Sequence, residues 1–449
     1  MPDDRGTESG ARATIAAVVD EFVELAPTTP ITFGQDGPLC WPGYAESTGR
    51  ARQRCGEAES VIYGRAVLGG IEAIVLAFDF RYLGGSVGGP TGERIEHAFT
   101  EARAHRLPVV SLLATGGSRM QEGMVSLSQL QRIACECQLT RDAGLAHVAV
   151  LRDPTTGGVW ASLGAGADVV LAESGARIGF GGKRVRRPED ADDPVFTAEG
   201  QLQAGQVDAV VDAEALSGVL ARWLNLLTGG GPDPAEVPRA LGARELPEDG
   251  WSAVTRARAE DRPRARAYLD DYFDGFELIS GDRCGGVDHG MLCGIGSRHG
   301  RSIAFAAQAG TPTTPAGYRT AVRLIRLAER LDMPVLTLVD TPGAANDAES
   351  ERLGLGPAIA ETFGVVAGAR VPITTLVIGE GGSGGALALA APGRTWITPD
   401  GYFSVIAPEG AAAILKREPT EVPALADLLR LRPQDLLELG VVAGIAPQS

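Results

Sequence analysis

The sequence predicts an α/β fold made of two similar domains. Its 449 residues exceed the size at which one hydrophobic core stops growing, so two domains of roughly 200 residues each are expected. Short apolar runs alternate with amphipathic stretches on both sides of a segment rich in Gly, Pro and acidic residues. Strands that alternate with helices in this way indicate parallel sheets covered by helices.

The apolar runs give the expected strands in chain order. In the first half they are IEAIVLAF (71–78), VVSLLAT (109–115), VAVLRD (148–153) and VVLAE (169–173). In the second half they are SIAFAAQ (302–308), VLTLVDT (335–341), ITTLVIGE (373–380) and TWITPD (395–400). Each run is short and bounded by turn residues, as expected of buried strands.

The domain boundary is expected at residues 227–250, which lack both the helical and the strand period. This predicts a first domain at 1–226 and a second at 251–449. The two halves also resemble each other in sequence. RLPVVSLLATGG and DMPVLTLVDTPG each have a proline before an apolar strand that ends in glycine. A second glycine-rich strand exit, DPTTGG or GEGGSGG, follows each at a matching interval. This spacing favours a duplicated domain over a chance likeness of two α/β halves.

Charge and composition favour a soluble metabolic enzyme. The net charge of −16 argues against nucleic acid or an anionic membrane as partner, because binding phosphates requires clustered Lys and Arg. The N-terminal segment MPDDRGTESGARATIAAVVDEF carries acidic residues where a signal peptide has basic ones, and no later segment resembles a membrane span. We therefore expect a cytoplasmic protein.

The six cysteines form no CxxC pair, so no metal is predicted. Cys135 and Cys137 lie two positions apart in a helical stretch and are expected on different faces. The sequence contains no GxSxG elbow, and the five histidines lie outside the glycine motifs, where surface or loop positions are expected. These patterns do not favour a nucleophilic triad.

Four glycine-rich segments carry the chemical signal, and each lies between an apolar run and a helical pattern. Where a strand turns into a helix, the first backbone N–H groups have no intrahelical partner, and glycine lets a ligand approach them. Two such amides aimed at one carbonyl oxygen form an oxyanion hole. Phosphate is the competing ligand, but no GxxxxGK[ST] occurs, and glycines that only close turns are the other alternative. The segments are GGSVGGPTGER (84–94), ATGGSRMQEG (114–123), DPTTGG (153–158) and GEGGSGGALALA (379–390).

Charged residues near these turns have two interpretations each. The acids Glu122, Asp153, Asp340 and Glu380 could be general bases, but capping helices or orienting loops is favoured. The basic run KRVRR (183–187) could bind the phosphates of a ligand such as coenzyme A, or could form a solvated loop.

At these motifs the sequence resembles the carboxyltransferase component of bacterial and plastid-type acetyl-CoA carboxylase. The first half is similar to its β subunit from RATIAAVVDEFVEL to QAGQVDAVV, and the second half to its α subunit from YLDDYFDGFELISGDR to YFSVIAPEGAAAILKR. The resemblance covers nearly the whole chain except the linker. It implies the crotonase-like ββα-spiral fold, present twice in one chain.

The resemblance also implies a site in which an acyl-CoA and carboxybiotin meet between an N-type and a C-type domain. Carried over by motif, Gly116 and Gly117 match one oxyanion pair, and Gly385 and Ala386 match the other. One pair would hold a thioester enolate and the other the ureido oxygen of biotin, in an order that stays open. The further substrate-binding candidates are Gly84, Gly85, Ser86, Arg119, Thr156, Gly157, Gly158, Lys183, Arg184, Gly343, Gly382 and Gly384.

The implied reaction starts when carboxybiotin releases carbon dioxide and its ureido anion deprotonates the acyl α-carbon. The enolate then attacks carbon dioxide, which gives malonyl-CoA from acetyl-CoA. The four-cysteine zinc ribbon of the family's β subunit has no match, and no Met-Lys-Met site occurs, so biotin is expected on a separate carrier protein. Biotin carboxylase and a homo-oligomer are the other expected partners. The alternatives are a biotin-independent decarboxylase of malonyl thioesters, a carboxyltransferase acting on a carrier-protein thioester, and a noncatalytic scaffold.

Overall fold

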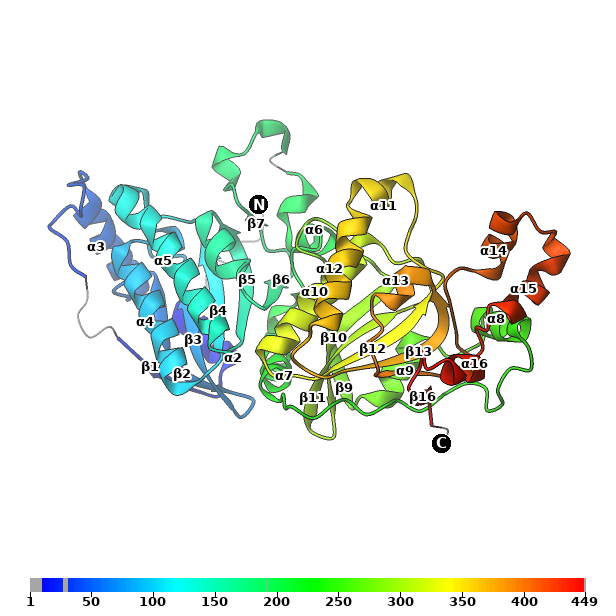
Figure 1. Cartoon of the computed structure of the whole chain (residues 1–449). Helices are drawn as coiled ribbons and strands as arrows, with labels where there is room; N and C mark the ends of the chain where they lie inside the picture. The colour runs from blue at the N-terminus through cyan, green and yellow to red at the C-terminus, as the bar shows by residue number, and fades with distance from the viewer. Residues whose placement is uncertain (1–9, 27–30, 191, 448–449) are drawn as a thin grey trace. The chain divides into compact units, whose positions relative to one another are not determined.

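The computed structural model describes residues 10–26, 31–190 and 192–447, so part of the acidic N-terminal segment lies outside the described residues. The chain divides into two compact units, Met1–Thr228 and Gly229–Ser449. Each unit is built on one eight-stranded sheet with helices packed against it (Figure 1). None of the described helices combines the length and hydropathy that crossing a membrane requires.

The first sheet has the order β1-β2-β3-β4-β5-β6-β8, and β7 pairs with the end of β5. Strands β1 to β3 pair antiparallel, whereas every pair from β3 onward is parallel. The strands are β1 (Glu21–Glu24), β2 (Val61–Leu68), β3 (Ile71–Phe78), β4 (Val109–Thr115), β5 (His147–Thr156), β6 (Val169–Glu173), β7 (Ile178–Gly179) and β8 (Ala209–Val211).

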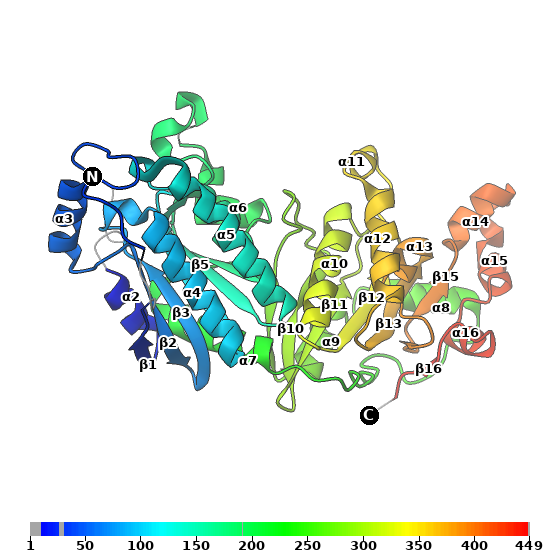
Figure 2. The same cartoon turned by 60° about the vertical axis from the view of Figure 1, so that its left-hand side comes forward.

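Helices α4 and α5 lie side by side over this sheet in both views (Figures 1 and 2). Ile95 and Phe99 of α4 are buried in one cluster with Leu76 and Phe78 of β3, which makes this face the main core of the unit. The helices are α2 (Ala11–Val18), α3 (Tyr44–Cys55), α4 (Gly89–His105), α5 (Gly123–Asp142), α6 (Ala198–Gln203) and α7 (Leu216–Thr228).

The second sheet has the order β16-β14-β13-β12-β11-β10-β9, and β15 pairs with the end of β13. Strand β10 pairs antiparallel with both β9 and β11, and the remaining pairs are parallel. The strands are β9 (Gly275–Ile279), β10 (Met291–Arg298), β11 (Arg301–Gln308), β12 (Val335–Thr341), β13 (Ile373–Gly382), β14 (Thr395–Ile397), β15 (Tyr402–Ser404) and β16 (Gly444–Ile445).

Helices α10 and α12 pack against each other beside the second sheet (Figures 1 and 2). Tyr268 and Leu269 of α9 belong to a separate buried cluster with Phe305, Leu336 and Leu376 of the sheet. The helices are α8 (Gly250–Arg258), α9 (Ala265–Tyr272), α10 (Pro315–Arg330), α11 (Ala348–Arg352), α12 (Leu355–Ala367), α13 (Ser383–Leu387), α14 (Pro408–Leu415), α15 (Val422–Leu428) and α16 (Pro433–Glu438).

The two units are copies of one topology, which confirms the predicted duplication. In both sheets the register of the two central parallel strands shifts just before their ends. After the shift Thr115 of β4 faces Thr155 of β5, and Thr341 of β12 faces Gly381 of β13. The isolated bridges Val87 to Ser118 and Thr313 to Ala344 repeat at the same interval along the chain. The strand ends that carry the glycine motifs therefore occupy equivalent places.

Some local details differ from the sequence interpretation. Helix α7 continues through Thr228, and residues 229–249 form no helix or strand. Ala235 of this segment is buried in the core of the second unit, so the segment packs as part of that unit. Cys135 is exposed and Cys137 buried, as predicted from their spacing. His147 is wrongly expected on the surface, because it lies within β5, only 1% exposed, and contacts Ser111 at 2.8 Å.

A buried ion-pair network around Arg119 joins several elements of the first unit. The guanidinium is 1% exposed and donates to Glu59 at 2.5 Å and to Glu122 at 3.1 Å. Burial opposes its charge, but Glu59 and Glu122 outweigh this effect and hold the pKa of Arg119 above its ordinary value. Glu122 in turn accepts from the N–H of Gly89, where α4 begins, and from the Tyr44 hydroxyl of α3.

Replacing Arg119 with Met should destabilise the first unit strongly. The substitution leaves two buried carboxylates without their cation, and breaking such a pair costs about 3–5 kcal/mol. Arg50→Met is the control, because Arg50 pairs with Glu46 on the exposed face of α3 and such pairs contribute about 0–1 kcal/mol. Urea unfolding of both variants measures the difference. Equal midpoints would show that the buried network does not stabilise the fold.

Candidate active site

The turns after β12 and β13 approach each other so closely that glycine is required. A Cβ on Gly385 would lie 2.3 Å from the amide nitrogen of Ala344, and one on Gly382 would lie 2.0 Å from the carbonyl oxygen of Pro342. Gly384 differs, because a Cβ there would meet nothing within 4 Å. The start of α13 is therefore pressed against the β12 turn on one side and open at Gly384.

The β12 turn is shaped by the hydroxyl of Thr341, which accepts from the N–H of Gly343 at 3.1 Å. Gly343 adopts a φ of 140°, which side chains rarely tolerate, and its carbonyl accepts from the N–H of Thr313. The predicted residues Gly343, Gly382, Gly384, Gly385 and Ala386 thus come together at adjacent strand ends of the second unit.

The first unit repeats this arrangement with its own glycines. Gly117 has a φ of 102° and Gly157 a φ of 79°, and a Cβ on Gly157 would lie 2.8 Å from the Cα of Gly117. Gly85 has a φ of 62°, and a Cβ on it would lie 2.1 Å from the carbonyl oxygen of Ala114. Backbone conformation and close approach therefore explain these three glycines.

The hydrogen bonds at Gly116 and Gly117 do not favour this pair as oxyanion donors. The N–H of Gly116 donates to the carbonyl of Gly84 at 2.8 Å, and the N–H of Gly117 donates to the Thr115 hydroxyl at 3.0 Å. Gly117 is the counterpart of Gly343, whose amide is used in the same way. Because Thr155 corresponds to Gly381 in the register, residues 158–160 correspond to residues 384–386. The motif spacing alone could not predict which backbone N–H groups donate hydrogen bonds within the protein and are therefore closed to a ligand.

A cavity of about 660 Å³ in the first unit gathers many of the predicted substrate-binding residues. Lys183 is exposed and pairs with Asp192 at 2.7 Å, so the basic run supplies cations to the rim of the cavity. Arg119 belongs to the lining, although its side chain is 1% exposed and is paired with Glu59 and Glu122. The predicted residues in the lining are Gly84, Ser86, Gly116, Arg119, Thr156, Lys183 and Arg184. Gly85, Gly157 and Gly158 lie beside them in the sequence but outside the lining.

The cavity also includes Arg177, which the motifs do not predict, and Arg186 from the predicted basic run. Arg177 lines it and donates to Asp153 at 2.8 Å. Arg186 lines it too, with its guanidinium 3.6 Å from the ring centre of Phe196. Burial and the charge of Arg177 lower the pKa of Arg186. Arg186 belongs to the basic run KRVRR, for which phosphate binding was one interpretation, whereas Arg177 was not among the predicted site residues.

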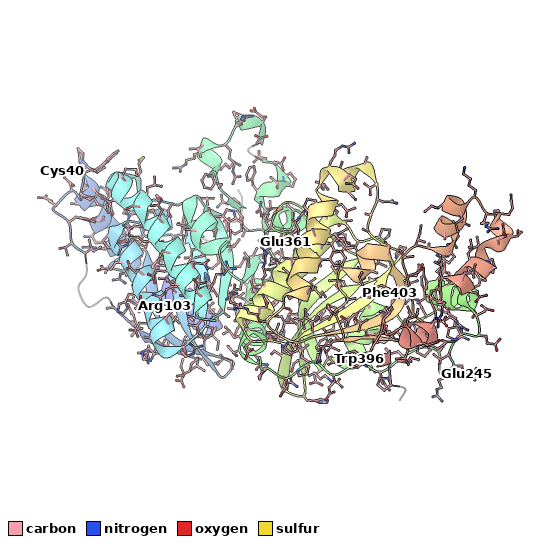
Figure 3. The ribbon with its side chains drawn as sticks, viewed as in Figure 1. Cys40, Arg103, Glu245, Glu361, Trp396 and Phe403 are labelled. Atoms are coloured by element: carbon pink, nitrogen blue, oxygen red, sulfur yellow. The ribbon has the colours of Figure 1, made fainter. Side chains whose placement is uncertain are left out.

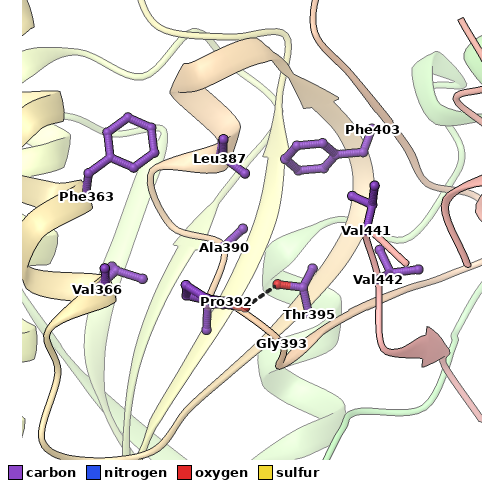
Figure 4. A pocket seen from close by; sticks show the side chains of 12 residues that line it. Phe363, Val366, Leu387, Ala390, Pro392, Gly393, Thr395, Phe403, Val441 and Val442 are labelled. Carbon is purple, nitrogen blue, oxygen red and sulfur yellow. Dashed lines mark hydrogen bonds between the residues drawn. The ribbon is translucent and has the colours of Figure 1, made fainter. Parts of the chain in front are cut away.

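A second cavity of about 310 Å³ lies beside α13 in the second unit (Figure 4). Its walls are mainly apolar, with Phe363 and Val366 from α12 and Leu387 from α13 (Figure 4). Phe403 from β15 completes this side of the cavity (Figures 3 and 4). The Thr395 hydroxyl donates to the carbonyl of Ala391 at its edge. Sequence motifs could not predict this cavity, because ordinary core-type residues from several elements form it.

The carboxylates near the turns are held by hydrogen bonds, which confirms their interpretation as orienting groups. Asp340 is fully buried and accepts from Arg262 at 2.6 Å, while burial raises its pKa. Glu380 accepts from the Tyr402 hydroxyl at 2.7 Å and from Arg258 at 2.9 Å. Among residues 10–26, 31–190 and 192–447, no three His, Cys, Asp or Glu side chains form a group that could hold a metal.

Comparison with known proteins separates the two halves in the expected way. Residues 43–211 match the carboxyl transferase domain family, and residues 248–449 match the family described as acetyl co-enzyme A carboxylase carboxyltransferase-like. The acetyl-coenzyme A carboxylase carboxyl transferase subunits beta/alpha of Salinispora arenicola is 41% identical over 89% of this chain and 75% of its own length. Its counterpart in Salinispora tropica is 40% identical over 98% of this chain and 82% of its own length.

Solved structures agree with the fold. The transcarboxylase 12S structure, with methylmalonyl-coenzyme A and methylmalonic acid bound, superposes with a TM-score of 0.79 at 20% identity. The alignment covers 99% of this chain and 88% of that one. A single-chain, multi-domain long-chain acyl-CoA carboxylase superposes with a TM-score of 0.75 over 98% of this chain and 46% of that one. With both halves matched in order, the chain belongs to the carboxyltransferase family of acetyl-CoA carboxylase, in the form that joins the beta and alpha subunits.

Proposed function

We propose that this protein transfers a carboxyl group from carboxybiotin to acetyl-CoA, which gives malonyl-CoA. Membership of the family establishes the reaction class, biotin-dependent carboxyl transfer to an acyl-CoA. The observation that carries the proposal is the pair of equivalent glycine turns at the carboxyl ends of central parallel strands. Two equivalent turns suit a reaction in which two different oxygen atoms gain negative charge.

In the second unit, the turn at Gly384, Gly385 and Ala386 is the proposed oxyanion site. The N–H groups of Gly384 and Gly385 are its donors, because Ala386 is the fourth residue of α13 and has an acceptor in Gly382. The first N–H groups of a helix have no intrahelical acceptor, and the missing side chain at Gly384 leaves open space beside them. In the first unit we assign this role to residues 158–160 at the start of the next helical turn, in place of Gly116 and Gly117. This choice follows from the register that relates the two units and from the bonds that occupy the other amides.

The site residues fit biotin as a neutral ring with one carbonyl oxygen. Backbone amides can hold such an oxygen without a charged side chain, and the open face at Gly384 admits a planar ring. Bound biotin would supply the carboxyl group and, once it has lost that group, a basic ureido oxygen. The chain's own contribution is to orient the two substrates and to hold charge on their oxygens.

The first cavity is the proposed site for the phosphates of coenzyme A. Lys183, Arg184 and Arg186 line this cavity from one segment of the chain. Arg177, the residue just before β7, lines it as well. Arg and Lys are suited to phosphate, and their grouping stands out in a chain of net charge −16. Partners in the proposed assembly are a biotin carboxyl carrier protein, a biotin carboxylase and further copies of this chain, in the cytoplasm.

A reverse assay tests the reaction. Purified protein mixed with malonyl-CoA should consume it at a substantial rate only when free biotin or a biotinylated carrier is present, because the carboxyl group needs an acceptor. Malonyl-CoA and carbon dioxide are measured with and without biotin. Carbon dioxide release at the same rate without biotin would instead identify a biotin-independent decarboxylase.

Substitution at the glycine turns tests which amides hold the oxyanion. Gly158→Val should lower kcat by about 10²-fold or more, because its side chain would keep the substrate oxygen away from the N–H groups of residues 158–160, and losing one oxyanion donor costs about this much. Its Cβ would meet only the flexible end of Leu130, so folding should survive. Gly116→Ala tests the original pair, because its added Cβ would lie 3.3 Å from its nearest neighbour and its amide is already bonded to the carbonyl of Gly84. A larger loss for Gly116→Ala than for Gly158→Val would restore the original pair.

Removing the basic side chains tests the phosphate site. The double variant Lys183→Ala, Arg184→Ala should raise KM for malonyl-CoA about tenfold with kcat nearly unchanged, because these cations bind a remote part of the substrate. Lys416→Ala, in the second unit, is the control and should leave KM unchanged. Malonyl-pantetheine lacks the nucleotide phosphates, so its KM should not respond to the double variant. An equal rise for both substrates would contradict the assignment.

A further inference from the structure

The carbonyl oxygen of Gly385 is held by two side chains instead of by its own helix. Helix α13 ends at Leu387, and the N–H of Leu389, which would bond Gly385 in a longer helix, donates to Ala386 at 3.3 Å. The Tyr318 hydroxyl donates to the Gly385 carbonyl at 2.9 Å. The side-chain amide of Gln308 donates to the same oxygen at 3.4 Å.

Both donors are firmly placed in the core of the second unit. Tyr318 on α10 and Gln308 at the end of β11 are 0% exposed. The Gln308 amide also donates to the Thr313 hydroxyl at 3.1 Å, which fixes its plane. Burial raises the pKa of Tyr318, so its hydroxyl keeps the proton that it donates.

Holding this carbonyl fixes the first turn of α13. The peptide between Gly385 and Ala386 is a rigid plane in which C=O and N–H point in opposite directions. With its carbonyl drawn toward Tyr318 in the core, Gly385 is held in the first turn of α13, where the N–H groups of residues 383–385 have no acceptor within the helix. A glycine at position 385 would otherwise leave this plane unusually free to rotate.

We propose that Tyr318 and Gln308 are positioning residues for carboxyl transfer, which hold the first turn of α13 so that the N–H groups of Gly384 and Gly385 face the oxygen that gains charge. This inference rests on the proposed function of the Gly385 turn. A preorganised donor stabilises developing charge because it needs no reorientation during the reaction. The two side chains keep the donor in place without touching substrate themselves.

The first unit lacks this device. The last residue of β3 is Phe78, the counterpart of Gln308, and the fourth residue of α4 is Gly92, the counterpart of Tyr318 on α10. Neither side chain can donate a hydrogen bond. The duplicated turns are therefore supported differently, which suits two turns that hold different oxygens.

The chain offers a matched control for a purely structural role. Tyr272 is also buried in the second unit, 3% exposed, and its hydroxyl donates to the backbone carbonyl of Glu236 at 2.9 Å. Tyr272→Phe and Tyr318→Phe thus each remove one hydroxyl bond to a backbone carbonyl. If such bonds only stabilise the fold, both variants should behave alike.

The experiment compares the two variants in the biotin-dependent malonyl-CoA assay and by hydrogen exchange without ligands. Tyr318→Phe should lower kcat about tenfold or more with KM nearly unchanged. This fall in kcat is smaller than the one expected when an oxyanion donor itself is lost. Exchange should accelerate in a peptide covering residues 383–390. Tyr272→Phe should change neither quantity, and both variants should melt within a few degrees of each other.

Separate outcomes decide the two proposals. A wild-type protein without biotin-dependent turnover contradicts the proposed function, whatever the variants do. An active wild type with equal kcat for both variants overturns the positioning role alone, as would faster exchange in Tyr318→Phe without a fall in kcat. If Tyr318→Phe fails to fold, Gln308→Met removes the second donor to the same carbonyl, and unchanged kcat in that variant is likewise decisive against the inference.

Discussion

The close approach of two backbone turns at the carboxyl ends of the central strands is the constraint on which each unit depends. Parallel strands place successive strand ends at one edge of a sheet, and the shift of register before Thr155 and Gly381 brings the turns into contact. At this contact there is no room for a Cβ on Gly382 or Gly385, or on Gly157 in the first unit. The glycine motifs are therefore structural requirements first. Their N–H groups can bind a ligand only where they donate no hydrogen bond within the protein.

The sequence was sufficient to predict the duplicated α/β fold and the places where function concentrates. Alternating apolar runs, repeated Pro-led strands and glycine-rich exits all report local requirements, and local requirements are readable from residue type. The sequence could not predict the directions of individual backbone N–H groups. Gly116 and Gly117 follow a strand just as Gly384 and Gly385 do, yet contacts with Gly84 and with the Thr115 hydroxyl consume the first two amides.

Long-range contacts explain what the sequence could not predict about other residues. Arg119 stands in a glycine motif and so suggests a substrate contact, but its partner Glu59 is distant in sequence and only the fold reveals that both are buried. Tyr318 and Gln308 carry no motif at all, because a hydroxyl and an amide on an amphipathic helix and a buried strand resemble ordinary core residues. Their role emerges only from the carbonyl that they share.

The carboxylates near the second turn bear on where the reaction finds its base. Asp340 is paired with Arg262 inside the core, and Glu380 is bonded to Arg258 and Tyr402. Carboxylates that are held in this way orient loops and are poorly placed to remove a proton from a substrate carbon, since each would first have to break its bonds. A protein that positions amides and commits these acids to structure is suited to a reaction in which one substrate supplies the base for the other. In biotin-dependent carboxyl transfer, the ureido oxygen of biotin meets that requirement once its carboxyl group has left.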